Sequence, residues 1–144
     1  MARVFPSWPS LRRFLLAHRE LLRTRRLVRQ RPAGSLVEIL EATTSPARPE
    51  DLPEAHAWAV AVGRAARSSL FRSTCLVRSL ALVRLLERAG IRGARLRAGV
   101  QRENGRFLAH TWVELGPQVL TDPAWYVARF EPWADLRLFE DLSR

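Results

Sequence analysis

Three residues of this sequence have the side chains and the order of a nucleophile, a base and an orienting carboxylate, namely Cys75, His110 and Asp122. A thiol beside an imidazole loses its proton and attacks a carbonyl carbon, and a carboxylate holds the imidazole in the required tautomer. Cys75 is the single cysteine, so it forms no internal disulfide and builds no thiolate-rich zinc site. These residue types predict acyl transfer through a cysteine, provided that the fold brings them together.

Cys75 lies at the start of the strongest predicted helix, which runs from Thr74 to Gly90. Thr74 suits the N-cap, and Gly90 suits the left-handed position that ends a helix. Apolar residues cover most of its circumference, which predicts a buried central helix. The free N–H groups of its first turn favour a thiolate and can stabilise an oxyanion. The alternative for a lone cysteine is a small buried core residue.

His110 lies in the middle of a predicted strand over 106–115. Alternation places it on one face of this strand together with Leu108, Trp112 and Glu114. In so apolar a strand the imidazole needs partners for its ring nitrogens, either as a base or as a satisfied core residue. Glu114 is a poor orienter because four residues separate it from His110, about 13 Å along a strand.

The loop that follows this strand decides whether Asp122 reaches His110. With a loop of two residues, Gly116-Pro117, the pairing turns Asp122 toward Thr111 on the wrong side of the sheet. With a loop of three residues, Leu115 to Pro117, Asp122 lies directly opposite His110 on the same face. The assignment of Asp122 as the orienting carboxylate therefore depends on the three-residue loop. The alternative for Asp122 is a turn residue before proline.

Two further residues are candidates for substrate contact. Arg78, one turn after Cys75, either orients a carbonyl or carboxylate of the substrate or packs its stem and bonds a backbone carbonyl. Trp112 shares the face of His110 and either shields the site from water or serves as a plain core residue. The three histidines show no HExxH spacing, so we expect no metal and no other cofactor.

The elements around these residues follow from hydrophobic periodicity and turn formers. Helices are predicted over 10–30, 35–40, 51–67 and 74–90, and strands over 94–101, 106–115 and 118–121. Asn104-Gly105 predicts a tight hairpin between the first two strands. The aromatic tail is expected to fold back onto the core through Trp125, Tyr126, Phe130 and Trp133. Helices followed by an antiparallel sheet predict an α+β domain.

Charge is the other strong feature, because all 24 basic side chains are arginine and the formal net charge is +10. This balance favours anionic partners, and the alternative is a bias in arginine usage. The basic helix over 10–30 either docks on such a partner or packs one face on the domain. Its apolar residues return at helical spacing: Leu11, Phe14, Leu15, Leu22 and Val28. We see no signal-peptide run and no bilayer-spanning stretch, so we expect a cytoplasmic protein.

A resemblance to a known family covers roughly residues 55–123. It rests on STCLVRSLAL at 73–82, FLAHTWVE at 107–114, and Gly90, Gly116 and Leu120 beside them. These blocks resemble the transglutaminase-like leader peptidases of lasso-peptide biosynthesis. Thr111 departs from the pattern, which has alanine after the histidine, and this change leaves the chemistry intact.

The resemblance implies a papain/transglutaminase-like fold, in which N-terminal helices and a central nucleophile helix pack on a small antiparallel sheet. It implies that Cys75, His110 and Asp122 remove the leader from a ribosomally synthesised precursor (RiPP maturation). It also implies a separate leader-recognition protein and an ATP-dependent lasso cyclase. Because the first 50 residues look helical, we expect the split, stand-alone form: one domain over 1–144, with an N-terminal extension over 1–50 and a catalytic core over 51–144.

Two other functions stay open on the sequence. A transglutaminase-like amidase acting on another substrate retains the same three residues. A non-catalytic basic module that binds nucleic acid or an anionic surface explains the charge of +10, but gives no reason for the order of Cys75, His110 and Asp122. For the peptidase we expect a precursor peptide and its recognition protein as partners, and no nucleic acid.

Overall fold

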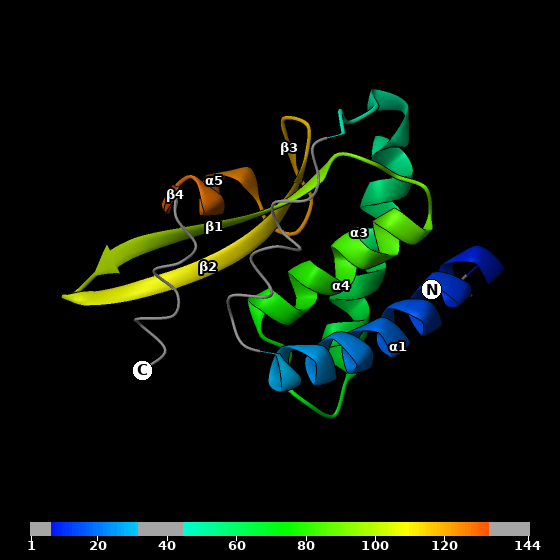
Figure 1. Cartoon of the computed structure of the whole chain (residues 1–144), viewed down its shortest axis with the longest axis horizontal. Helices are drawn as coiled ribbons and strands as arrows, with labels where there is room; N and C mark the ends of the chain where they lie inside the picture. Colours follow the sequence, from blue (N-terminus) through cyan, green and yellow to red (C-terminus); the bar gives the residue numbers. More distant parts are fainter. Residues whose placement is uncertain (1–6, 32–44, 133–144) are drawn as a thin grey trace, which may run out of the picture.

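The computed structural model describes residues 7–31 and 45–132. In chain order its elements are α1 (Trp8–Gln30), the 3-10 turn η1 (Pro49–Asp51), α3 (Leu52–Ser68), α4 (Cys75–Arg88), β1 (Ala94–Glu103), β2 (Arg106–Leu115), β3 (Gln118–Val119), α5 (Ala124–Val127) and β4 (Glu131–Pro132). The three long helices lie together, and β1 and β2 extend away from them as a curved ribbon (Figure 1). The predicted α+β order is confirmed, whereas the helix predicted over 35–40 and Trp133 lie outside the described residues.

One hydrophobic core joins the three long helices to one face of the sheet. Leu21 of α1, Leu82 and Leu86 of α4, and Val113 of β2 are fully buried within it. Full burial of such a side chain contributes about 1.5–3 kcal/mol. Since α4 contacts α1, α3, β1 and β2, the prediction of a buried central helix is confirmed. No helix in 7–31 or 45–132 is long and apolar enough to cross a membrane.

Helix α4 begins and ends where its sequence predicts. The Thr74 hydroxyl accepts the N–H of Val77 at 3.3 Å and so caps the first turn. At the other end Gly90 has a φ of 78°, a left-handed conformation that glycine adopts without strain. The Ile91 N–H then bonds the Leu86 carbonyl at 2.9 Å, which closes a Schellman motif. These two caps fix where the helix of Cys75 starts and how the chain enters the sheet.

The inward face of α1 differs from the predicted stripe. Leu11, Leu15 and Leu22 are 38%, 59% and 38% exposed. The buried residues of α1 are Ala17, Glu20, Leu21 and Thr24. Only Phe14 and Val28 of the predicted stripe pack against the core. Two arginines of α4 bind Glu20 and hold it on the buried face of α1. Hydrophobic periodicity assigns a carboxylate to the exposed face, so the predicted orientation of this helix is rotated from the observed one.

The sheet is antiparallel, with the strand order β3-β2-β1-β4. The central pair runs in register from Ala94 opposite Leu115 to Glu103 opposite Arg106. Asn104 and Gly105 form the loop between them, with φ angles of 51° and 77°. Two consecutive left-handed residues are characteristic of a type I′ turn. The hairpin predicted from this dipeptide is confirmed.

The next hairpin corrects the predicted register. Leu115 pairs with Gln118, so the loop is Gly116-Pro117 and has two residues, not three. Gly116 has a φ of 58°, and glycine at the first central position, followed here by a residue with a fixed negative φ, suits a type II′ turn. The last bond of this ladder runs from the Leu120 N–H to the Val113 carbonyl at 2.8 Å. The sheet pairing therefore ends just before Thr121.

The chain after this point covers the second face of the sheet. Trp112, Val127 and Phe130 form a separate buried cluster there, with Val119 and Tyr126 against it. The short strand β4 pairs with β1, with Gly99 opposite Pro132. The tail thus folds back as predicted over its described part, although the sequence did not predict α5 or β4. In β2, Trp112 and Val113 face opposite sides, which confirms the predicted alternation.

Candidate active site

Cys75 is the first residue of α4 and is half-buried. The first intrahelical bond of α4 runs from the Arg78 N–H to the Thr74 carbonyl, and the Val77 N–H is bound by the Thr74 hydroxyl. Helix geometry leaves the N–H groups of Cys75 and Leu76 without an intrahelical partner. These N–H groups lie at the start of the helix beside Cys75, where such donors can stabilise a negatively charged oxygen.

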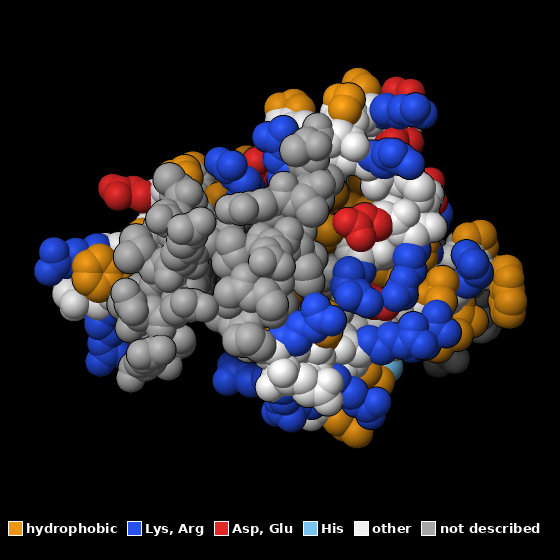
Figure 2. All heavy atoms as spheres, in the orientation of Figure 1, with side chains coloured by type: hydrophobic (Ala, Val, Ile, Leu, Met, Phe, Trp, Pro, Cys, Tyr) orange, Lys and Arg blue, Asp and Glu red, His pale blue; other side chains and the backbone are white. Residues whose placement is uncertain are grey.

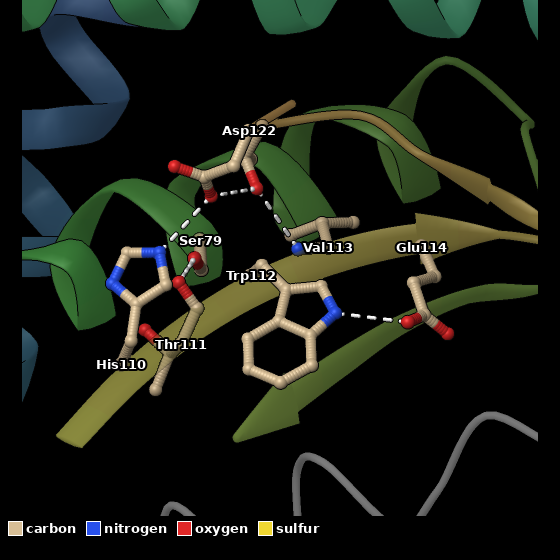
Figure 3. Close-up of polar contacts among 8 residues, drawn as sticks. Ser79, His110, Thr111, Trp112, Val113, Glu114 and Asp122 are labelled. Atoms are coloured by element: carbon tan, nitrogen blue, oxygen red, sulfur yellow. Dashed lines mark hydrogen bonds and ion pairs between the residues drawn. The ribbon is translucent and has the colours of Figure 1, made fainter. Parts of the chain in front are cut away.

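His110 and Asp122 are in direct contact. The distance from His110 Nε2 to Asp122 Oδ2 is 3.1 Å, and Figure 3 shows the two side chains turned toward each other. The side chains are 11% and 21% exposed, so neighbouring atoms hold both in place. Because an ionised carboxylate only accepts hydrogen bonds, Nε2 is the donor. The lone pair of this neutral imidazole then resides on Nδ1, the nitrogen that can take a proton from a thiol.

Asp122 reaches His110 by a bend, not by strand pairing. Beyond Leu120, the N–H of Val113 bonds the hydroxyl of Thr121 at 3.1 Å. The same hydroxyl donates to Asp122 Oδ2 at 3.0 Å. Since the Thr121 side chain occupies the place of a backbone acceptor, the chain turns out of the ladder and presents the carboxylate to the imidazole. The predicted contact exists, but the register from which it was predicted is wrong.

A small hollow of about 50 Å³ joins the three predicted residues. Its lining comes from α3, α4, β2 and the bend after β3: Ala59, Val62, Gly63, Cys75, Arg78, Ser79, His110, Thr111, Thr121 and Asp122. The structure therefore brings Cys75, His110 and Asp122 to one place from three different elements. Arg78 is exposed at this hollow, where its guanidinium can reach a bound substrate.

Aromatic rings hold the imidazole of His110 from the second face of the sheet. The ring centroids of Tyr126 and Phe130 are each 5.3 Å from it, and that of Trp112 is 6.2 Å away. Trp112 is 3% exposed, and its indole N–H donates to Glu114 at 2.8 Å. It does not line the hollow and packs beside the imidazole as part of the buried cluster on the second face of the sheet. The sequence did not indicate Tyr126 and Phe130 as neighbours of His110.

Ser79 is a second residue that the sequence did not single out. Its hydroxyl donates to the backbone carbonyl of Thr111 at 3.3 Å, and the residue is 1% exposed. Ser79 lies one turn after Cys75, and Thr111 directly follows His110. This bond therefore ties the helix of the thiol to the strand of the imidazole (Figure 3). The sequence did contain a signal for Ser79, namely a serine on the apolar side of a helix predicted to be buried.

Comparison with protein families assigns the domain. A model described as the transglutaminase-like superfamily matches residues 19–135, well over half of the chain. The chain belongs to this superfamily. The match spans Cys75, His110 and Asp122. No curated protein and no solved structure matches the chain.

The transglutaminase-like assignment agrees with the arrangement of helices and curled antiparallel sheet, and the predicted fold class is confirmed. This superfamily contains enzymes of the cysteine-protease type. Its fold is compatible with a cysteine peptidase or an amidase, since both attack a carbonyl carbon with a thiolate and expel an amine.

Proposed function

We propose that this transglutaminase-like protein is a cysteine peptidase in which Cys75 is the nucleophile, His110 the base and Asp122 the orienter. The observation that carries this proposal is the 3.1 Å contact between His110 Nε2 and Asp122 Oδ2 beside a hollow that Cys75 also lines. A carboxylate that accepts from Nε2 fixes the tautomer of the imidazole and leaves Nδ1 as the nitrogen that can accept the proton of the thiol.

The reaction proceeds in two halves. His110 Nδ1 takes the proton of Cys75, the sulfur bonds to the carbonyl carbon, and the N–H groups at the start of α4 stabilise the oxyanion. His110 then gives this proton to the departing amine as the C–N bond breaks, which leaves a thioester on Cys75. In the second half His110 takes a proton from water, the hydroxide attacks the thioester, and the acid product leaves with the thiol restored.

The proposed substrate is the precursor of a lasso peptide, cut at the junction of its leader and core. The support is the resemblance of the Cys75 and His110 blocks to leader peptidases of that biosynthesis. A hollow of about 50 Å³ holds the reacting groups but has little room for substrate side chains. Much of the substrate recognition then comes from elsewhere, as expected if a separate recognition protein presents the leader before a cyclase acts.

The decisive variant is Cys75→Ala. We expect it to abolish cleavage of a precursor peptide presented with its recognition protein, because no other thiol exists in the chain. Mass spectrometry of the products measures the cleavage, and circular dichroism checks that the fold persists. Cleavage by the folded variant at the wild-type rate contradicts the proposal.

An amidase that acts on a side-chain amide is the second candidate, and the family match favours it equally. The chemistry up to the thioester is the same, so Cys75→Ala inactivates both enzymes. The product separates them: a peptidase produces two peptide fragments, whereas an amidase leaves the chain intact and releases ammonia or a small amine.

A further inference from the structure

A larger cavity, of about 310 Å³, lies between α1, α3 and α4. It is lined by Arg12, Leu16, Arg19, Glu54, Trp58, Leu85, Arg88 and Ala89, and we call it the arginine cavity. It shares no lining residue with the catalytic hollow. Because Arg88 ends the helix that Cys75 begins, the two sites are about 20 Å apart along α4. The arginine cavity takes no part in the reaction.

Hydrogen-bond donors dominate the polar lining of the arginine cavity. Arg12 and Arg19 are exposed and form no ion pair within 7–31 and 45–132. Arg88 gives one nitrogen to Glu20, and a guanidinium has further N–H groups to donate. The indole N–H of Trp58 is buried out of reach of a water molecule, so the polar donors that face the open space are those of the arginines. Guanidinium donors from α1 and α4 thus surround a space that an anionic acceptor would complete.

The rest of the lining is apolar. Leu16, Leu85 and Ala89 contribute aliphatic surface, and Trp58 adds its ring. Glu54 is the one acidic residue against three arginines, so the cavity keeps a positive charge. In Figure 2 basic side chains gather over α1 and α4 on the face of the molecule that is shown. A carboxylate side chain suits this lining, because its charged group can bind the arginines while its methylene groups pack on the apolar residues.

We propose that the arginine cavity docks a carboxylate side chain from an acidic segment of the peptide substrate, remote from the bond that is cut. The proposal rests on the proposed peptidase function for the identity of the peptide. An extended chain needs about six residues to cover 20 Å, so the acidic residue lies at least that far from the cleaved bond. A peptide is favoured over nucleic acid because a phosphodiester offers no aliphatic stem to the apolar half of a concave site.

The test measures binding in the Cys75→Ala protein, so that turnover contributes nothing. The probe is a short fluorescein-labelled peptide in which glutamate alternates with leucine, and its counterpart carries glutamine in place of glutamate. Arg12→Gln/Arg19→Gln removes two donors of the cavity. Arg23→Gln/Arg26→Gln is the matched control, because it removes the same charge from exposed positions of α1 that do not line the cavity.

Fluorescence anisotropy should show tighter binding of the glutamate peptide than of the glutamine peptide. We expect Arg12→Gln/Arg19→Gln to weaken it roughly tenfold. The control pair should change it by less than about twofold. Equal losses in both arginine pairs overturn the proposal, because they show general charge attraction. Displacement by inorganic phosphate or by a single-stranded oligonucleotide more readily than by free glutamate overturns the choice of a peptide carboxylate.

Two results distinguish this proposal from the proposed function. If the glutamate peptide does not bind while the wild-type protein cleaves a precursor and Cys75→Ala does not, the docking site is wrong and the peptidase stands. If folded Cys75→Ala still cleaves, the peptidase mechanism is wrong whatever the binding shows.

Discussion

The orientation of His110 is set by a short chain of hydrogen bonds that starts from the backbone of its own strand. The N–H of Val113 binds the Thr121 hydroxyl, this hydroxyl binds Asp122 Oδ2, and the same oxygen contacts His110 Nε2. Each donor has an acceptor along this chain, so the carboxylate is restrained by two bonds. A base held in this way loses little entropy when a substrate binds.

At the same scale, Ser79 acts as a positioning residue between the thiol and the imidazole. Ser79→Ala removes its 3.3 Å bond to the Thr111 carbonyl and lets α4 shift against β2. We expect kcat to fall roughly tenfold with little change in KM, because a small misplacement of reacting groups lowers the rate. The free energy of unfolding should fall by about 1 kcal/mol. Steady-state kinetics and urea unfolding measure the two effects.

Thr111→Val is the matched control for Ser79→Ala. It keeps the carbonyl that Ser79 binds, and the hydroxyl it removes has no partner in the described part of the chain. We therefore expect its kcat to stay far closer to wild type than that of Ser79→Ala. If the two variants lose equal activity, or if Ser79→Ala changes only stability, Ser79 does not position the site.

At the scale of elements, local signals predicted α4 and the first hairpin well. Thr74, Gly90 and the dipeptide Asn104-Gly105 act within a few residues of themselves, so no distant contact is needed to interpret them. The second hairpin was harder, because both loop lengths agree with Gly116-Pro117 until the register is known. Helix α5 and strand β4 have four and two residues, too short for periodicity to indicate.

The candidate site was predictable in its residue types but not in its construction. The order of Cys75, His110 and Asp122 follows from the chain, and the contact of His110 with Asp122 was expected. The bend that makes this contact depends on the Thr121 hydroxyl replacing a backbone acceptor, which no spacing rule indicates. Trp112 was expected on the face of His110, but Tyr126 and Phe130 come from the tail, and the sequence predicted only that the tail folds back.

A substitution at Gly99 tests whether the residues on the second face of the sheet hold His110 in place. This glycine lies opposite His110 in the β1–β2 pair, and a Cβ there would come within 2.9 Å of Phe130 Cβ, the Glu131 carbonyl and the Trp112 ring. Gly99→Ala must push β4 and Phe130 away from the imidazole. We expect a loss of about 1–3 kcal/mol in the free energy of unfolding and a lower kcat, measured by urea unfolding and by precursor cleavage.

Gly63→Ala is the stability control for Gly99→Ala. A Cβ at Gly63 in α3 meets only Arg67 at 3.5 Å, an ordinary contact, and alanine is the better helix former. This variant should gain about 0.5–1 kcal/mol. A Gly99→Ala protein as stable as wild type would show that β4 moves freely, and the support of His110 by Phe130 would then be disproved.

At the scale of the whole molecule, helix α4 connects the candidate active site to the arginine cavity. Its first residue carries the thiol at the junction of helices and sheet, and its last, Arg88, lines the arginine cavity. Helix α1 is bound to α4 through Glu20, which is buried and forms ion pairs with Arg84 at 2.6 Å and with Arg88. The same carboxylate thus fixes α1 on the domain and orients one arginine of the cavity.

Glu20→Gln tests this contact between α1 and α4 with almost no change in the shape of the side chain. The neutral amide cannot replace two charge-assisted bonds, and the part-exposed arginines (side chains 33% and 47% exposed) recover some hydration when released. We expect a loss of about 1–3 kcal/mol in the free energy of unfolding, together with faster amide hydrogen exchange in α1. Glu103→Gln is the matched control, because it removes the same charge from an exposed pair with Arg129 and should cost less than about 1 kcal/mol. Equal losses of stability in the two variants would mean that net charge, and not the ion pairs of Glu20, holds α1 to α4.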